Sequence, residues 1–158
     1  MHFVLNYAFV LLMVAAASCS KQVSKASATK DLANTWQWVR TDGGIANHIH
    51  ETPLSTGKNI TLKISNNSNS YAIYTNDSLT SQGTYTLEER TCIHDQTNKT
   101  FINFSADTDW MIEKIDSENL QLSDESMDGL QSIYKRQTAS NRQFGFAKRF
   151  QITGSMGF

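Results

Sequence analysis

The stretch ITLKISNNSNSYAIYT, residues 60–75, carries the pattern that decides the fold. Its first six residues alternate between apolar and polar side chains, beginning with Ile60, so on a β-strand the apolar ones share a face. The polar residues 66–69 then supply a turn, and alternation resumes at Tyr71. Two short alternating runs around a turn predict a pair of antiparallel strands, each with one face against a core.

The same period of two recurs along most of the chain, with turn residues between the runs. The further apolar pairs are Trp36 and Trp38, Tyr85 and Leu87, Ile102 and Phe104, Trp110 and Ile112, Leu120 and Leu122, and Ile133 and Tyr134. About eight short, evenly spaced strands predict an all-β antiparallel sandwich or barrel. Closure into a barrel would remove both sheet edges, but alternation alone does not distinguish the two architectures.

An apolar run at residues 3–17 opens the chain and ends at four small or reactive residues, Ala16-Ala17-Ser18-Cys19. As a helix of about 15 residues it is shorter than the roughly 30 Å hydrocarbon core of a bilayer. Its length suits the apolar part of a secretory signal better, and the small residues suit a cleavage site.

The residues Ala16 to Cys19 resemble the lipobox of bacterial lipoproteins, in which the cysteine thiol receives a diacylglycerol and the peptide is cut before it. The resemblance implies a signal peptide over 1–18, lipidation of Cys19 and a place in the bacterial cell envelope, on the periplasmic face of a membrane or at the cell surface. More than one acyl chain gives a stable membrane anchor. A plain signal peptide and an uncleaved anchor remain alternatives, and the lack of Lys or Arg before the apolar run departs from the usual pattern.

The remainder of the chain divides by composition into three parts. Residues 19–31 are rich in Ser, Ala and Lys without an apolar period, which predicts a flexible tether. Residues 32–137 hold the alternating runs and predict one compact domain. Residues 138–158 contain no acidic residue and no clear period, and predict a loose basic tail.

Charge is unevenly distributed along the chain. All 15 Asp and Glu lie between Asp31 and Asp128, a range with only six Lys and Arg, so the body is strongly acidic and its flanks are basic. An acidic body argues against nucleic acid as a partner. The basic tether suits either anionic lipid headgroups or a simple solvated linker.

Several motifs in the body, taken in order, resemble the lipocalin-like domains of bacterial lipoproteins. They are Leu32-Ala33-Asn34-Thr35-Trp36, Gly43-Gly44, Thr52-Pro53, Gly57, Tyr71-Ala72-Ile73-Tyr74, Gly83-Thr84-Tyr85, Leu120-Gln121-Leu122-Ser123-Asp124, Asp128-Gly129 and Tyr134-Lys135-Arg136. The resemblance covers residues 32–137 and implies an eight-stranded up-and-down barrel. It also implies that Trp36 closes one end and that Arg136 packs across its indole. Asn34 departs from the usual Gly, mildly, because Asn tolerates a left-handed backbone.

Two functions are open for such a barrel. It binds a small apolar ligand, with Trp38, Tyr71, Tyr85, Phe104 and Trp110 as candidate lining residues. Alternatively, its own side chains fill it, and it serves as a structural module or presents loops to an envelope protein.

Catalytic or metal-binding motifs are weak. His48-Ile49-His50-Glu51 lacks the spacing and the third ligand of a metal site and is predicted to be a loop. Cys92 is predicted to be a buried, inert thiol without a disulfide partner if Cys19 is acylated. The sequence therefore indicates neither an enzyme nor a cofactor.

Overall fold

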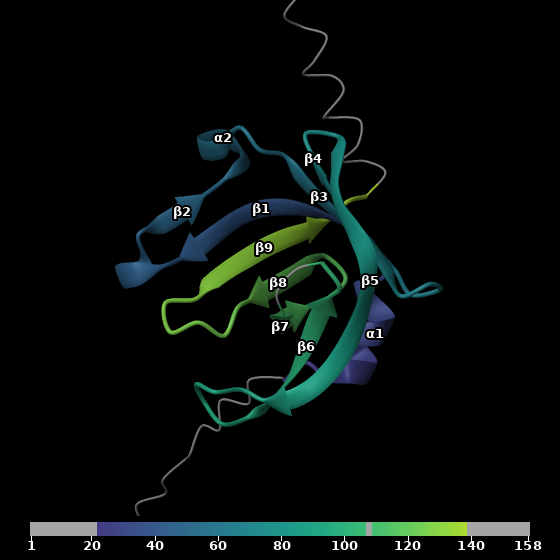
Figure 1. Ribbon diagram of the computed structural model, residues 1–158, viewed down its shortest axis with the longest axis vertical. Coiled ribbons are helices and arrows are strands. Elements are labelled where there is room, and N and C mark those ends of the chain that lie inside the picture. Colours follow the sequence, from purple (N-terminus) through teal and green to yellow (C-terminus); the bar gives the residue numbers. More distant parts are fainter. Residues whose placement is uncertain (1–21, 107–108, 139–158) are drawn as a thin grey trace, which may run out of the picture.

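The computed structural model describes residues 22–106 and 109–138, and strands make up most of them (Figure 1). The elements are α1 (Lys25–Leu32), β1 (Thr35–Gly43), the 3₁₀ turn η1 (Ile45–Asn47), β2 (Ile49–Glu51), α2 (Pro53–Thr56), β3 (Ile60–Ser65), β4 (Ser70–Thr75), β5 (Ser78–Thr91), β6 (Asn98–Phe104), β7 (Asp109–Ile115), β8 (Asn119–Ser123) and β9 (Leu130–Arg136). Within these ranges no helix is long and apolar enough to cross a membrane. The predicted signal peptide 1–18, Cys19 and nearly all of the tail 138–158 lie outside the described residues.

Eight strands, β1 and β3 to β9, close into an antiparallel barrel. Each strand from β3 onward pairs with the next in the chain, and β9 returns to pair with β1 from Trp36–Arg136 to Gly43–Leu130. The pairing of β1 with β3 completes the ring. The predicted all-β, eight-stranded up-and-down barrel is confirmed, and the sandwich alternative is excluded.

One edge of β1 pairs with β9, and its other edge pairs with two different strands, β3 and β2. Its beginning pairs with β3, whereas Thr41 to Gly43 pair with the short strand β2. A register shift between Trp38 and Arg40 lies between the two pairings. As a result β1 and β3 diverge at one end of the barrel, and the chain bridges the gap through β2 and α2. The prediction of a loop at 48–51 is wrong for β2, whose three residues are all exposed and give no apolar alternation.

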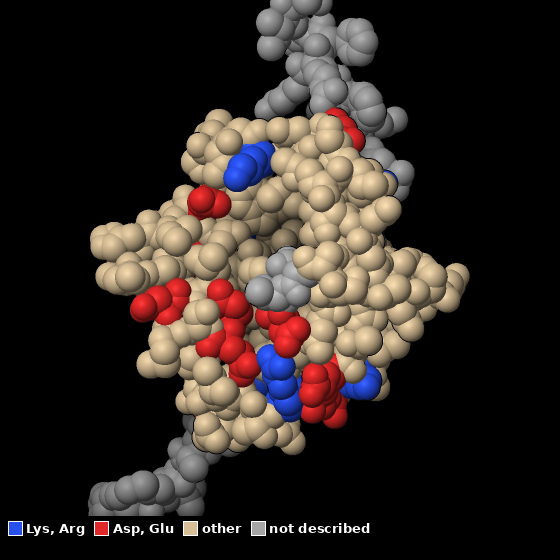
Figure 2. Space-filling model, in the orientation of Figure 1, with Lys and Arg blue, Asp and Glu red and all other residues tan. Residues whose placement is uncertain are grey.

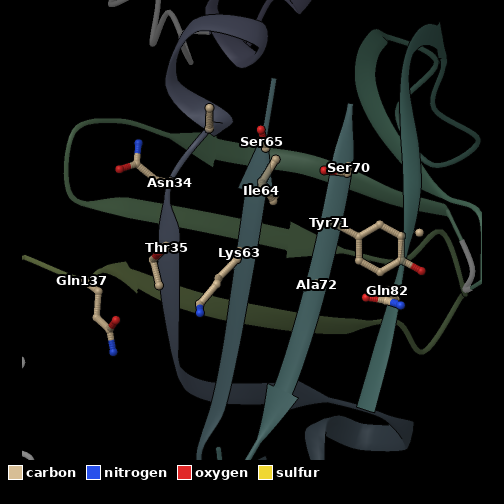
Figure 3. Close-up of a pocket in the computed structure, with 12 residues that line it drawn as sticks. Asn34, Thr35, Lys63, Ile64, Ser65, Ser70, Tyr71, Ala72, Gln82 and Gln137 are labelled. Atoms are coloured by element: carbon tan, nitrogen blue, oxygen red, sulfur yellow. The ribbon is translucent and has the colours of Figure 1, made fainter. Parts of the chain in front are cut away.

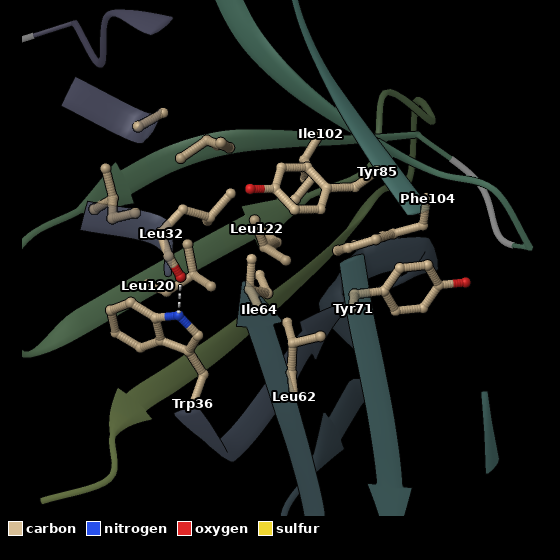
Figure 4. Packing of buried hydrophobic residues seen from close by; sticks show 13 residues of the cluster. Leu32, Trp36, Leu62, Ile64, Tyr71, Tyr85, Ile102, Phe104, Leu120 and Leu122 are labelled. Carbon is tan, nitrogen blue, oxygen red and sulfur yellow. Dashed lines mark hydrogen bonds between the residues drawn. The ribbon is translucent and has the colours of Figure 1, made fainter. Parts of the chain in front are cut away.

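The inner face of the barrel holds the main core, and most of its residues are those predicted by the period of two (Figure 4). Ala28 and Leu32 of α1 and Ile115 of β7 were not among them. Trp36, Ile102 and Leu120 have no exposed surface. The others of this cluster with less than a tenth of their surface exposed are Ala28, Leu32, Leu62, Ile64, Tyr71, Tyr85, Phe104, Ile112, Ile115 and Leu122. Burial of large apolar side chains at roughly 25 cal/mol per Å² is the main force that holds the strands in this register.

Helix α1 corrects the prediction of a flexible tether over residues 19–31. Ser24 caps the helix by accepting a hydrogen bond from the Ser27 backbone N–H, and Ala28 and Leu32, four residues apart on one face, are fully buried against the barrel. Lysine and polar residues occupy the exposed positions, so the composition of the segment is typical of a linker and did not predict a helix. The second half of the predicted tether is therefore part of the folded domain.

The two ends of the barrel differ. At one end, which we call the closed end, α1 lies across the opening: the Leu32 carbonyl accepts from the Trp36 indole N–H (2.8 Å), and the Val23 carbonyl accepts from Thr100 (2.8 Å). Figure 1 shows α1 beside β5. At the other end, the mouth, no helix of the described ranges crosses the opening. It is bordered by η1, β2, α2, the β4–β5 turn and the loop 124–129.

Glycine is required where β1 reaches the mouth. Gly43 has φ of 135°, and a Cβ at this position would lie 2.1 Å from the Gly129 carbonyl oxygen. The backbone of β1 and that of the β8–β9 loop therefore approach each other more closely than any side chain permits.

Candidate functional site

The protein's own side chains fill the barrel from α1 as far as Tyr71 and Phe104, and this filled part is the closed half. The rings of Tyr71 and Phe104 pack with centroids 4.6 Å apart, and the Tyr85 hydroxyl donates to Asn66 Oδ1 at 2.7 Å. Burial raises the pKa of Tyr85 above its ordinary value, so the phenol stays protonated. Figure 4 shows these rings beside Leu62, Ile64 and Leu122, and Trp36 closes the cluster below Leu120.

The five residues proposed to line a ligand fall into two groups. Tyr71, Tyr85 and Phe104 are buried within the core cluster. Trp38 and Trp110 are not part of the buried cluster: Trp38 is buried outside it, and Trp110 is partly exposed and packs against it. Of the five residues, only Trp110 is partly exposed.

Small and hydroxylated residues continue the inner face toward the mouth. Thr41 stands opposite Ser132 across β1 and β9, and their hydroxyls are 2.8 Å apart. The Trp38 indole N–H donates to Thr41 Oγ1 at 2.9 Å, so the polar edge of this ring is already satisfied. On the other side Ser81 faces Ile73 in register, with its Oγ 3.3 Å from the Tyr71 hydroxyl.

The space above these small residues is open to solvent. Figure 2 shows a hollow near the middle of the face that carries the mouth. Toward this end the inner face carries Ile73 and Trp110, which are partly exposed and pack against the core, and the hydroxyl groups of Thr41, Ser81 and Ser132. Such a combination suits a small, largely apolar molecule with few polar atoms.

The four most exposed large apolar side chains at the mouth lie on four different segments of the rim. They are Ile45 of η1, Leu54 of α2, Leu79 at the start of β5 and Met127 of the β8–β9 loop, with 76%, 96%, 48% and 88% of their surface exposed. They come together only because up-and-down topology brings these connections to one end. No periodic pattern marks them, so they were not predicted from the sequence.

The mouth is also acidic. Figure 2 shows carboxylates gathered below the hollow, with few Lys or Arg around it. The acidic residues on the segments at this end are Asp42, Glu51, Asp77, Asp109, Asp124, Glu125 and Asp128.

One arginine on the outer surface fixes part of this rim. The Arg90 guanidinium bonds to Asp109 (3.0 Å) and Glu125 (2.9 Å) and stacks 3.9 Å from the Phe101 ring centroid. Beneath it, Cys92 packs with Phe101 and Met111 in a small outer cluster, so the predicted burial of the thiol is confirmed. Arg90 thereby ties the loop 124–129 to the barrel wall.

The structure brings Trp36 and Arg136 together, as the resemblance implies. They face each other in the β1–β9 register, and the guanidinium carbon lies 5.3 Å from the indole centroid. Arg136 Nε is buried and has no hydrogen-bond partner among the described residues. The contact with the ring face is worth about 0.5–2 kcal/mol and partly offsets the cost of burying Nε without a hydrogen bond.

A second hollow, of about 730 Å³, lies on the outer wall over β1, β3, β4 and β5 (Figure 3). Its lining includes Lys63, Ala72 and Gln82, which alternate with core residues and so face outward. Lys63 rests against the Tyr74 ring at 4.4 Å. The groove is shallow and polar, and no set of side chains converges in it.

The described residues contain no group of three His, Cys, Asp or Glu that could hold a metal ion. His50 pairs instead with Asp42 at 3.0 Å on the rim. Comparison with known protein families, with curated proteins and with solved structures found no match to this chain.

Proposed function

We propose that this chain is a lipocalin-like lipoprotein of the bacterial cell envelope, anchored through Cys19, and that the mouth of its barrel binds a small apolar ligand. The observation that carries ligand binding is the division of the interior. The closed half is packed with large apolar side chains, whereas the inner face toward the mouth carries hydroxyl groups and the partly exposed ring of Trp110, and the mouth face shows an open hollow.

The filled closed half limits what the ligand is. A long chain that threads the whole barrel would displace Tyr71, Phe104 and Ile64 from the core, at a cost of several kcal/mol. A short acyl chain or a compact apolar molecule occupies the mouth half without such displacement. The ligand proposed here is therefore small and enters no further than the level of Tyr71.

The anchor rests on the residues Ala16 to Cys19 and on their place after an apolar run. Substitution Cys19→Ser tests it in the bacterial source or a bacterial host. We expect the natural protein to incorporate a labelled fatty acid and to sediment with membranes, and the variant to do neither.

The alternative is a barrel that holds no ligand and acts as a structural or protein-interaction module. The density of the core supports it, since most inward residues are large and already in contact. Native mass spectrometry of the chain, purified from an envelope extract, distinguishes the two. A bound apolar mass that is lost on denaturation supports ligand binding, whereas a clean mass of the protein alone supports the module.

A matched pair of variants locates the bound mass. Ser81 and Gln82 are neighbours on β5 that face opposite sides of the wall. We expect Ser81→Phe to fill the mouth and abolish the bound mass, and Gln82→Phe to keep it. Equal retention in both variants would place the ligand elsewhere, and thermal unfolding of each variant shows that it is folded.

A further inference from the structure

The attachment of the N-terminal segment to the closed end begins almost at the proposed lipid. The Val23 carbonyl accepts a hydrogen bond from Thr100 Oγ1 at 2.8 Å, and the Thr100 side chain is buried. The Lys25 backbone N–H donates to Glu89 at 3.0 Å, and the buried residues Ala28 and Leu32 follow. The chain is therefore bound to the barrel from Val23 onward.

This leaves a very short connection to the anchor. Four peptide units separate Cys19 from Val23, and an extended chain of that length spans at most about 14 Å. A seven-residue strand such as β6 is already about 23 Å long. The connection is shorter than the barrel, so the barrel wall beside Val23 cannot move far from the bilayer.

Val23 lies at the closed end. Its partner Thr100 is the third residue of β6, whose first residues lie at the closed end and whose last residue, Phe104, leads to the mouth. The lysines Lys25, Lys30 and Lys135 are exposed at this end, on α1 and at the end of β9. The acidic residues at this end are partly engaged within the protein: Glu89 accepts from the Lys25 backbone N–H (3.0 Å), and Asp116 pairs with Lys114 (3.2 Å). Asp31 lies on α1 beside the two lysines of the helix.

We infer that the closed end is the surface that meets the membrane, with phospholipid headgroups against α1, and that the mouth points away from the bilayer that holds the anchor. This inference rests on the proposed lipidation of Cys19. The acidic rim agrees with it: Arg40 and Arg90 pair with three of its seven carboxylates, and an anionic leaflet repels the rest. On α1 the two lysines outnumber the single acidic residue, Asp31, so the helix is attracted to such a leaflet. The exposed apolar side chains of the rim then face the aqueous compartment, where ligand is exchanged.

Energy transfer from the protein to labelled headgroups measures the orientation. The lipidated full chain is reconstituted in vesicles of phosphatidylcholine with a minor fraction of phosphatidylglycerol and an acceptor-labelled lipid. A donor is attached at Asn67→Cys, in the β3–β4 turn of the closed end, or at Leu54→Cys, on the mouth. Cys92 is buried and Cys19 is acylated, so each variant carries one reactive thiol.

We expect transfer from position 67 to be several-fold more efficient than transfer from position 54. Equal or reversed efficiencies in an anchored protein would overturn the inference and leave the anchor intact. A protein that does not stay with the vesicles would overturn both the anchor and the orientation.

Lengthening the connection supplies the control. About 20 Gly and Ser residues inserted after Ser20 add roughly 25 Å of reach. The difference in transfer efficiency between positions 67 and 54 should then become smaller. An undiminished difference would show that the short connection does not orient the barrel, and would overturn the inference.

Discussion

The indole of Trp36 joins three parts of the molecule. Its N–H donates to the Leu32 carbonyl at the end of α1, its ring is fully buried in the barrel core, and its face meets Arg136 of the last strand. Trp36, on β1, thus contacts both α1 and β9. Its removal affects both the core and the cover of the closed end.

We expect Trp36→Ala to lower the free energy of unfolding by about 3–5 kcal/mol, because it leaves a large cavity and an unpaired carbonyl. Trp36→Phe keeps most of the volume and should cost less than half as much. Urea unfolding followed by far-ultraviolet circular dichroism measures both. An unchanged midpoint in the alanine variant would contradict the role of Trp36 in the core.

Asp116 organises the turn between β7 and β8. Its Oδ1 accepts from the backbone N–H of Glu118 (2.8 Å) and of Asn119 (2.7 Å). These hydrogen bonds hold the pKa of the carboxyl well below its ordinary value, and the one from the Glu118 N–H has the largest effect. A pKa lowered in the folded state means that the stabilisation is complete above the unfolded-state pKa of about 3.9 and is lost as the pH falls below it.

Asp116→Ala should therefore lower the free energy of unfolding by about 1–2 kcal/mol at neutral pH, and the difference from the natural protein should shrink between about pH 4 and pH 2. Glu118→Ala removes a neighbouring exposed carboxylate and serves as the control. Unfolding in urea at several pH values gives the profile. If the difference in the free energy of unfolding between Asp116→Ala and the natural protein stayed constant or grew in acid, the stabilising role of the ionised Asp116 would be contradicted.

At the scale of elements, the sequence predicted the barrel strands and missed two short pieces. Each of the eight alternating runs became a strand because one face of each is buried, and burial is what the period of two reports. Helix α1 has only Ala28 and Leu32 as its buried face, too few for a helical period to stand out. Strand β2 buries nothing, and only its pairing with β1 defines it.

The contribution of α1 to the fold is tested by two substitutions in this one helix. Leu32→Ala removes a fully buried side chain and should cost about 2–5 kcal/mol, whereas Lys30→Ala, on the exposed face, should stay within about 0.5 kcal/mol. Thermal unfolding of the two variants compares them directly. Similar midpoints would mean that the helix is not part of the core and that this segment acts as a linker.

At the scale of the whole molecule, the barrel has a packed closed half and an open mouth half. The aromatic positions were predictable from the sequence, but which of them fill the core was not. That depends on where each strand crosses the barrel: Tyr71 and Phe104 meet in the core at 4.6 Å, while Trp110 stays partly exposed. The rim of apolar side chains likewise exists only in the closed fold, because it joins four segments far apart in sequence.

The three tryptophans report directly on the claim that ligand occupies the mouth half. The measurement is a nitrogen–proton correlation spectrum of the indole N–H groups during titration with a short-chain monoacylglycerol below its micelle concentration. We predict that the Trp38 and Trp110 signals shift in a saturable way, whereas the signal of the Trp36 N–H, which is bonded to Leu32 at the closed end, stays in place. A shift of Trp36 equal to the others, or no saturable shift of any of the three, would contradict it.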